Sequence, residues 1–81
     1  MIEPFQEGQD WILAFNVHEF DARGLRGTRD HSGERIMLIF DKCWTGSEWA
    51  RQIVFAKKFS SRDDAELYQV QNEQQMLDKL G

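Results

Sequence analysis

The hydrophobic pattern along the chain predicts three strands followed by one helix. Between Trp11 and Phe20, residues alternate with a period of two and are rich in aromatic and branched types, as in a strand. The stretch Arg35–Trp44 contains a continuous apolar run, which favours a central strand covered on both faces. Thr45-Gly46-Ser47 then predicts a short turn, and Trp49–Phe59 predicts a third strand that completes a β-hairpin.

A helix is predicted over about residues 61–80. Ser61 is a typical N-cap hydroxyl, and the acids Asp63 and Asp64 follow where the positive end of the helix dipole stabilises them. Gly81 stands where helices commonly end. Apolar residues at helical spacing form the stripe expected to face the sheet. That stripe consists of Ala65, Val70, Met76, Leu77 and Leu80.

Together these elements predict an α+β fold in one small domain that spans residues 1–81. We expect a three-stranded antiparallel sheet with the second strand in the centre and one C-terminal helix packed on one face. Residues 1–10 are expected to form an extended N-terminal arm. Residues 22–34 contain three glycines and no apolar periodicity, so they are expected to form a long flexible loop.

This arrangement leaves one face of the sheet without a helix. If Trp44 pairs with Trp49 across the turn, both faces of the hairpin are apolar, and the single helix covers only one of them. Exposed apolar area of this kind is more often an interaction surface than bare protein. The sequence therefore predicts a homodimer or a module that binds a protein partner; alternatively, the N-terminal arm covers this face within the monomer. The residues expected on it are Met37, Ile39, Cys43, Val54 and Ala56.

Composition supports a folded chain with a small core. Hydrophobic residues make up 41% and charged residues 30% of the 81 residues, a globular balance. A chain of this length buries only about 60–65% of its unfolded surface, so association would add stability. The single cysteine excludes an internal disulfide and favours a cytoplasmic location. No signal-like segment and no apolar run near the roughly 20 residues of a membrane span are found, so no membrane association is expected.

Charge is segregated along the chain and suggests a second function. The net charge is −4, yet residues 23–62 hold nine Lys or Arg against four acids. Cations interleaved with tryptophans can bind a phosphate backbone and stack on bases, so a nucleic-acid-binding module is the first alternative. The acidic total weighs against it, and internal pairing of the cations with the acidic helix and N-terminal arm is the favoured explanation. The candidate contacts are Arg23, Arg26, Arg29, Lys42, Arg51, Lys57 and Lys58.

The second alternative is a small-ligand pocket lined by Trp11, Trp44 and Trp49. Catalytic or cofactor chemistry has little support, since Cys43, His18 and His31 are the only soft candidates for nucleophile and base. No CxxC, HExxH or phosphate-binding glycine motif is present in the sequence. We therefore expect a non-enzymatic protein without catalytic residues, metal or cofactor.

Overall fold

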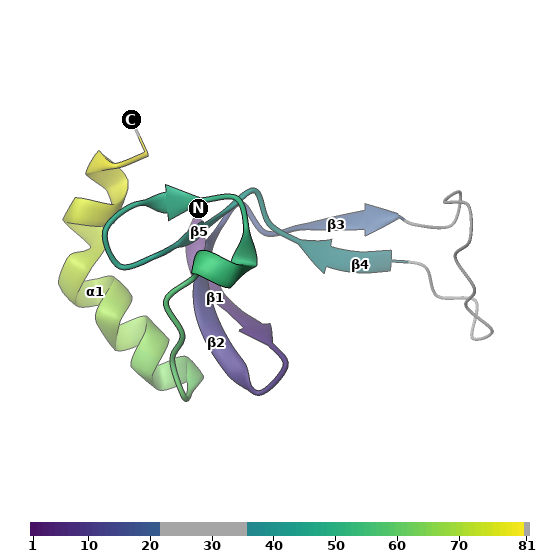
Figure 1. Cartoon of the computed structure of the whole chain (residues 1–81), viewed down its shortest axis with the longest axis horizontal. Helices are drawn as coiled ribbons and strands as arrows, with labels where there is room; N and C mark the ends of the chain where they lie inside the picture. Colours follow the sequence, from purple (N-terminus) through teal and green to yellow (C-terminus); the bar gives the residue numbers. More distant parts are fainter. Residues whose placement is uncertain (22–35, 81) are drawn as a thin grey trace.

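A computed structural model describes residues 1–21 and 36–80 (Figure 1). It confirms an α+β fold in which one C-terminal helix packs on an antiparallel sheet. The sheet has four strands, however, not three, and their order is β1-β2-β5-β6. The strands are β1 Ile2–Glu7, β2 Asp10–Phe15, β5 Lys42–Trp44 and β6 Trp49–Ala50. The helix α1 spans Arg62–Asp78.

The additional strand is β1, which forms from the residues expected to be an extended arm. It pairs antiparallel with β2 from Ile2 opposite Phe15 to Glu7 opposite Asp10. The connecting loop has two residues, and Gly8 at its first position has a φ of 61°, the conformation that a type II′ hairpin turn requires there. Because β1 is an edge strand, the missing N–H of its proline is tolerated.

The first and second predicted strands each divide into two. β3 (His18–Asp21) follows β2, and β4 (Ile36–Ile39) precedes β5, so β3 and β4 form a separate two-stranded ribbon. The pairs Ala14–Cys43 and His18–Ile39 belong to one continuous antiparallel register. The ribbon is therefore an extension of the central β2–β5 pair, and Figure 1 shows it pointing away from the helix.

The division occurs at Asn16, the one described non-glycine residue with positive φ, at 60°. Asparagine tolerates this left-handed conformation better than most residues. Its side-chain amide donates to Asp41 Oδ2 at 2.6 Å, and its carbonyl lies 2.8 Å from His18 Nδ1. These contacts hold the bend between the four-stranded sheet and the ribbon.

The third predicted strand is wrong beyond its first two residues. Trp49 pairs with Trp44 as expected, but β6 ends at Ala50, so Lys42 has no cross-strand partner in β6. The chain then forms the 3₁₀ helix η1 (Ile53–Phe55) and returns to the sheet, where Phe59 pairs with Trp11. Ile53 and Ala56 pack on the sheet face opposite the helix, and their burial outweighs the strand preference of the segment.

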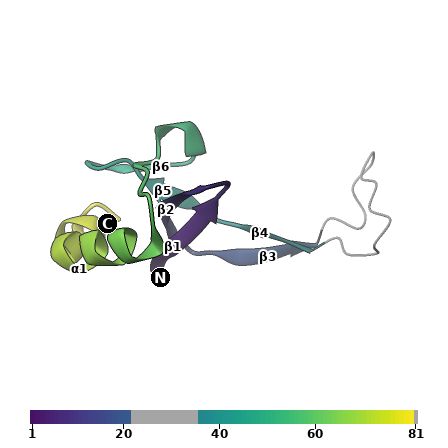
Figure 2. The ribbon, with the colours of Figure 1, turned by 90° about the horizontal axis from the view of Figure 1, so that it is seen from below.

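Two apolar clusters cover the two faces of the sheet. The helix side holds the larger cluster, in which Leu13 and Trp44 pack against Ala65 and Met76 of α1. The opposite side holds a smaller cluster of Ile12, Cys43 and Ala56, with partly buried neighbours around it. Figure 2 shows α1 on one side of the sheet and the segment after β6 on the other. The segment of η1 thus takes part of the role that a second helix would have.

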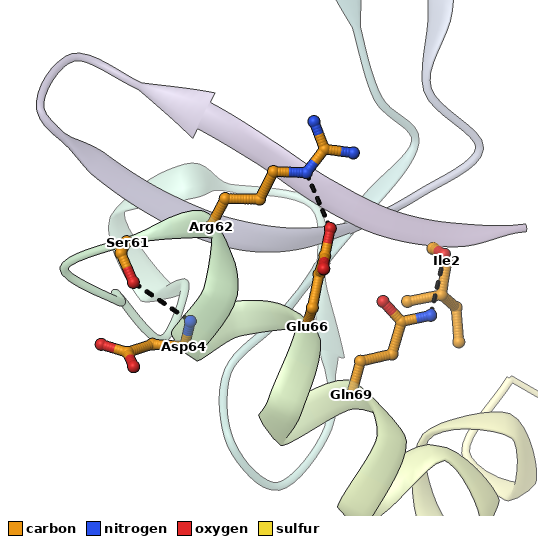
Figure 3. Close-up of polar contacts among 6 residues, drawn as sticks. All are labelled: Ile2, Ser61, Arg62, Asp64, Glu66 and Gln69. Carbon is orange, nitrogen blue, oxygen red and sulfur yellow. Dashed lines mark hydrogen bonds and ion pairs between the residues drawn. The ribbon is translucent and has the colours of Figure 1, made fainter.

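The helix begins as expected, but its buried side differs from the predicted stripe. The Ser61 hydroxyl accepts from the Asp64 amide at 3.1 Å, and Gln69 Nε2 donates to the Ile2 carbonyl at 3.0 Å (Figure 3). Ala65 and Met76 are fully buried, whereas Val70 is 76% exposed and Leu77 is also exposed. The helix therefore presents a second apolar stripe to solvent.

Replacing Asn16 tests the strained bend. Asn16→Ala should lower the free energy of unfolding by about 1–2 kcal/mol, because alanine has a Cβ penalty in the left-handed region. Asn16→Gly removes the same amide contact without that penalty, so it should cost less. Urea unfolding followed by tryptophan fluorescence measures both. Equal stability of the two variants would contradict the role of the positive φ.

Candidate interaction surface

Two of the residues expected on the uncovered face belong to the interior. Cys43 is fully buried, and Ala56 is 8% exposed; both lie in the smaller apolar cluster. The Cys43 thiol donates to the Gln52 carbonyl at 3.4 Å, and burial raises the pKa of this thiol. These residues support the face from within, so a partner cannot contact them directly.

The exposed part of this face contains an apolar groove, which we call the β4 groove. Its volume is about 340 Å³. The rings of Phe5 and Phe40 meet edge to face, with centroids 5.2 Å apart, and form one stable part of its wall. Glu7 and Arg51 add one acid and one base to the lining. The apolar lining residues are Phe5, Leu38, Ile39, Phe40 and Ile53.

The ribbon beside the groove exposes further apolar side chains. Because neighbouring pairs alternate between faces, Phe20 and Met37 lie on one face together with the pair of His18 and Ile39. Leu38 lies on the other face, opposite Glu19. Met37 is 53% and Leu38 is 60% exposed. Figures 1 and 2 show that neither α1 nor the four-stranded sheet lies over the ribbon.

The apolar surface continues along η1. Val54 is 72% exposed, and Phe55 is 60% exposed. Phe55 also lines a second hollow of about 350 Å³, together with Thr45, Glu48 and Ala50. Since Ile53 lines the β4 groove, η1 has one residue in each depression. The η1 segment thus covers part of the sheet face opposite the helix. The solvent-facing side of η1 is itself apolar.

The three tryptophans lie on the helix side and belong to the larger cluster. Trp44 is fully buried, and its indole N–H donates to the Tyr68 hydroxyl at 3.1 Å. Trp49 donates to the Met76 carbonyl at 2.8 Å, and its ring meets Trp44 edge to face at 5.2 Å. Trp11 is partly buried beneath the Arg62 guanidinium, 5.9 Å from the ring centroid. Their ring area is used mainly to bind α1 to the sheet.

The structure disperses the candidate cations. Arg51 lines the β4 groove, whereas Lys42 pairs with Phe15 in the central sheet. Lys57 lies over the rings of Phe59 and Tyr68, at 5.6 and 5.4 Å, and Lys58 approaches Asp10 at 4.0 Å. Arg23, Arg26 and Arg29 lie outside the described residues. Binding of nucleic acid stays a prediction.

Other chemistry was sought in residues 1–21 and 36–80. No group of three or more His, Cys, Asp or Glu residues in these ranges is arranged to hold a metal ion. In the same ranges, no helix has the length and apolar character needed to cross a bilayer.

The sequence pattern does not predict several of the residues that line the groove. The expected N-terminal arm includes Phe5, although Pro4 is typical of an edge strand and Gly8 fits a two-residue hairpin loop. These two signals predict the β1–β2 hairpin, and its register places Phe5 opposite Ile12. No local signal places Phe40 or Leu38 beside Phe5, because that contact joins distant segments.

The buried thiol makes stability depend on pH at the alkaline end. In the unfolded chain Cys43 loses its proton near its usual pKa of about 8.5, while in the folded chain burial keeps it protonated to higher pH. The unfolded state therefore releases its proton first, and the free energy of unfolding should fall as pH rises above about 8.5. Urea unfolding across this range should show a smaller fall for Cys43→Ala than for the wild type. Parallel curves would contradict this assignment.

Comparison of the chain with protein-family models, with curated proteins and with solved structures gave no match in any of the three.

Proposed function

We propose that this protein is a non-enzymatic interaction module that binds a protein chain through the β4 groove and the adjoining ribbon. The observation that supports this most is the gathering of five apolar side chains around one groove, with Leu38 60% exposed at its border. Large exposed apolar patches on small domains most often mark contact sites for another protein.

The energetics of the ribbon favour the same interpretation. A two-stranded hairpin without further cover is marginally stable in water, whereas a hairpin packed on another element is stable. Full burial of one large apolar side chain contributes about 1.5–3 kcal/mol. Covering Met37 and Leu38 together would therefore offset a substantial part of the cost of ordering both partners.

The charged residues of the groove restrict which partner surface fits it. Glu7 and Arg51 are both exposed and lie in the lining of the same groove. An apolar centre with a few charged groups at its border is the usual anatomy of a protein interface. A partner that presents an apolar side chain flanked by opposite charges would be complementary to it.

Two matched variants test the proposal. Leu38→Glu places a charge in the groove, and Leu67→Glu places one on the exposed side of α1, where leucine is 57% exposed. Each tagged full-length chain is mixed with extract from its source cells and with its own untagged copy, and the retained protein is quantified. We expect Leu38→Glu to reduce retention of a specific chain by about tenfold or more, with no change for Leu67→Glu.

Circular dichroism of both variants confirms that each retains the fold before binding is compared. Equal retention by the two variants would show that binding occurs elsewhere on the molecule. Absence of any specifically retained chain, including the untagged copy, would overturn the proposed function.

A further inference from the structure

The strand edges of this protein differ in how they are protected against pairing with another chain. Exposed edges of monomeric sheets usually carry charge or proline, or are very short. β1 carries Pro4 and the acids Glu3 and Glu7, and β6 has only two residues. β3 carries Glu19 at its centre. Among the strands that the structure describes, three of the four edges thus have such a feature.

β4 is the exception. Its four residues are Ile-Met-Leu-Ile, with neither a charge nor a proline. One side of β4 pairs with β3, and no strand among the described residues pairs with the other side. That side carries the backbone N–H and C=O groups that a further strand would satisfy. Leu38 and Ile39 of β4 also line the β4 groove.

We propose that β4 pairs antiparallel with β4 of a second copy of this chain, about a two-fold axis. The two ribbons would then form one four-stranded sheet of order β3-β4-β4-β3. This inference rests on the proposed function, and it names the partner of that surface.

Charge favours pairing of a second copy with the ribbon through β4 rather than through β3. The chain has a net charge of −4, so two copies repel each other unless their contact avoids the acids. Pairing through β4 joins two uncharged strands and keeps each Glu19 one strand away from the axis. Pairing through β3 would bring the two Glu19 carboxylates toward each other, and like charges on neighbouring strands are destabilising.

The groove is also self-complementary in charge. In a two-fold contact, if residue i of one copy meets residue j of the other, then residue j of the first copy also meets residue i of the second. Glu7 and Arg51 line the same groove as Leu38 and Ile39 of β4, so each copy would bring one acid and one base to the contact. Such a contact needs no charge from a different protein.

The dimer would also complete the ribbon structurally. The ribbon continues the β2–β5 pair but has only two strands, so further strands would widen its apolar surface. Self-pairing supplies four strands and brings Met37 and Leu38 into contact with the second copy. The dimer would thus explain why these two side chains are exposed in the single chain.

Light scattering coupled to size-exclusion chromatography tests the inference on the full chain at micromolar concentration. The wild type should elute with twice the mass of one chain. Met37→Lys and Leu38→Lys should weaken the dimer by about tenfold or more, since lysine on an edge opposes pairing. The matched control is Leu67→Lys, which makes the same kind of change at an exposed apolar position of α1, outside the ribbon and the β4 groove. It should retain the dimer mass.

Hydrogen exchange of the wild type gives a reading that does not depend on any variant. Backbone amides in Ile36–Ile39 should gain protection as concentration rises, while those of α1 should not. A wild type with the mass of one chain, or equal loss of the dimer in Leu67→Lys and Met37→Lys, would overturn self-pairing through β4. A monomeric wild type that retains another protein in a Leu38-dependent way would overturn this inference and leave the proposed function standing.

Discussion

The rest of the structure depends on the antiparallel pair of β2 and β5, which is buried on both faces. Ala14 and Cys43 face each other in this pair, and neither has any solvent exposure. A strand pair covered on two sides needs two covering layers, and residues 1–21 and 36–80 contain one long helix. The helix covers the side of Leu13 and Trp44, and the short η1 segment covers the side of Ile12. The second layer is thin, so apolar side chains remain on its outer surface.

The same central pair determines where the ribbon lies. Its register continues without a shift from Ala14–Cys43 to His18–Ile39, so β3 and β4 extend the sheet beyond the region that either layer reaches. The left-handed Asn16 and its bond to Asp41 mark the limit of the covered part. Beyond that limit the chain keeps its backbone pairing but loses its cover. A strand with unpaired backbone groups along its free edge and exposed apolar side chains is well suited to binding another strand.

Much of the candidate surface follows from tertiary contacts. The sequence predicted that one sheet face lacks a helix, and this imbalance is visible in the exposure of Met37 and Val54. It also placed Cys43 and Ala56 on that surface, where the structure buries them. The difference arises because Ile53 and Ala56 are three residues apart, the repeat of a 3₁₀ turn, which brings both onto the same side. In an apolar segment this short, strand and turn give similar patterns, and only burial against Ile12 and Cys43 distinguishes them.

The sequence by itself determined the features that rest on local chemistry: the Ser61 cap, the helix that follows it and the Trp44–Trp49 turn pairing. Tertiary structure alone decided which side of the helix faces the sheet. Both sides of α1 carry apolar residues, so hydrophobicity does not choose between them. Partly buried hydrogen bonds favour the observed side, because the Trp44 indole donates to the Tyr68 hydroxyl and the Ile2 carbonyl accepts from Gln69. Those partners are more than twenty residues apart, and only the folded chain brings them together.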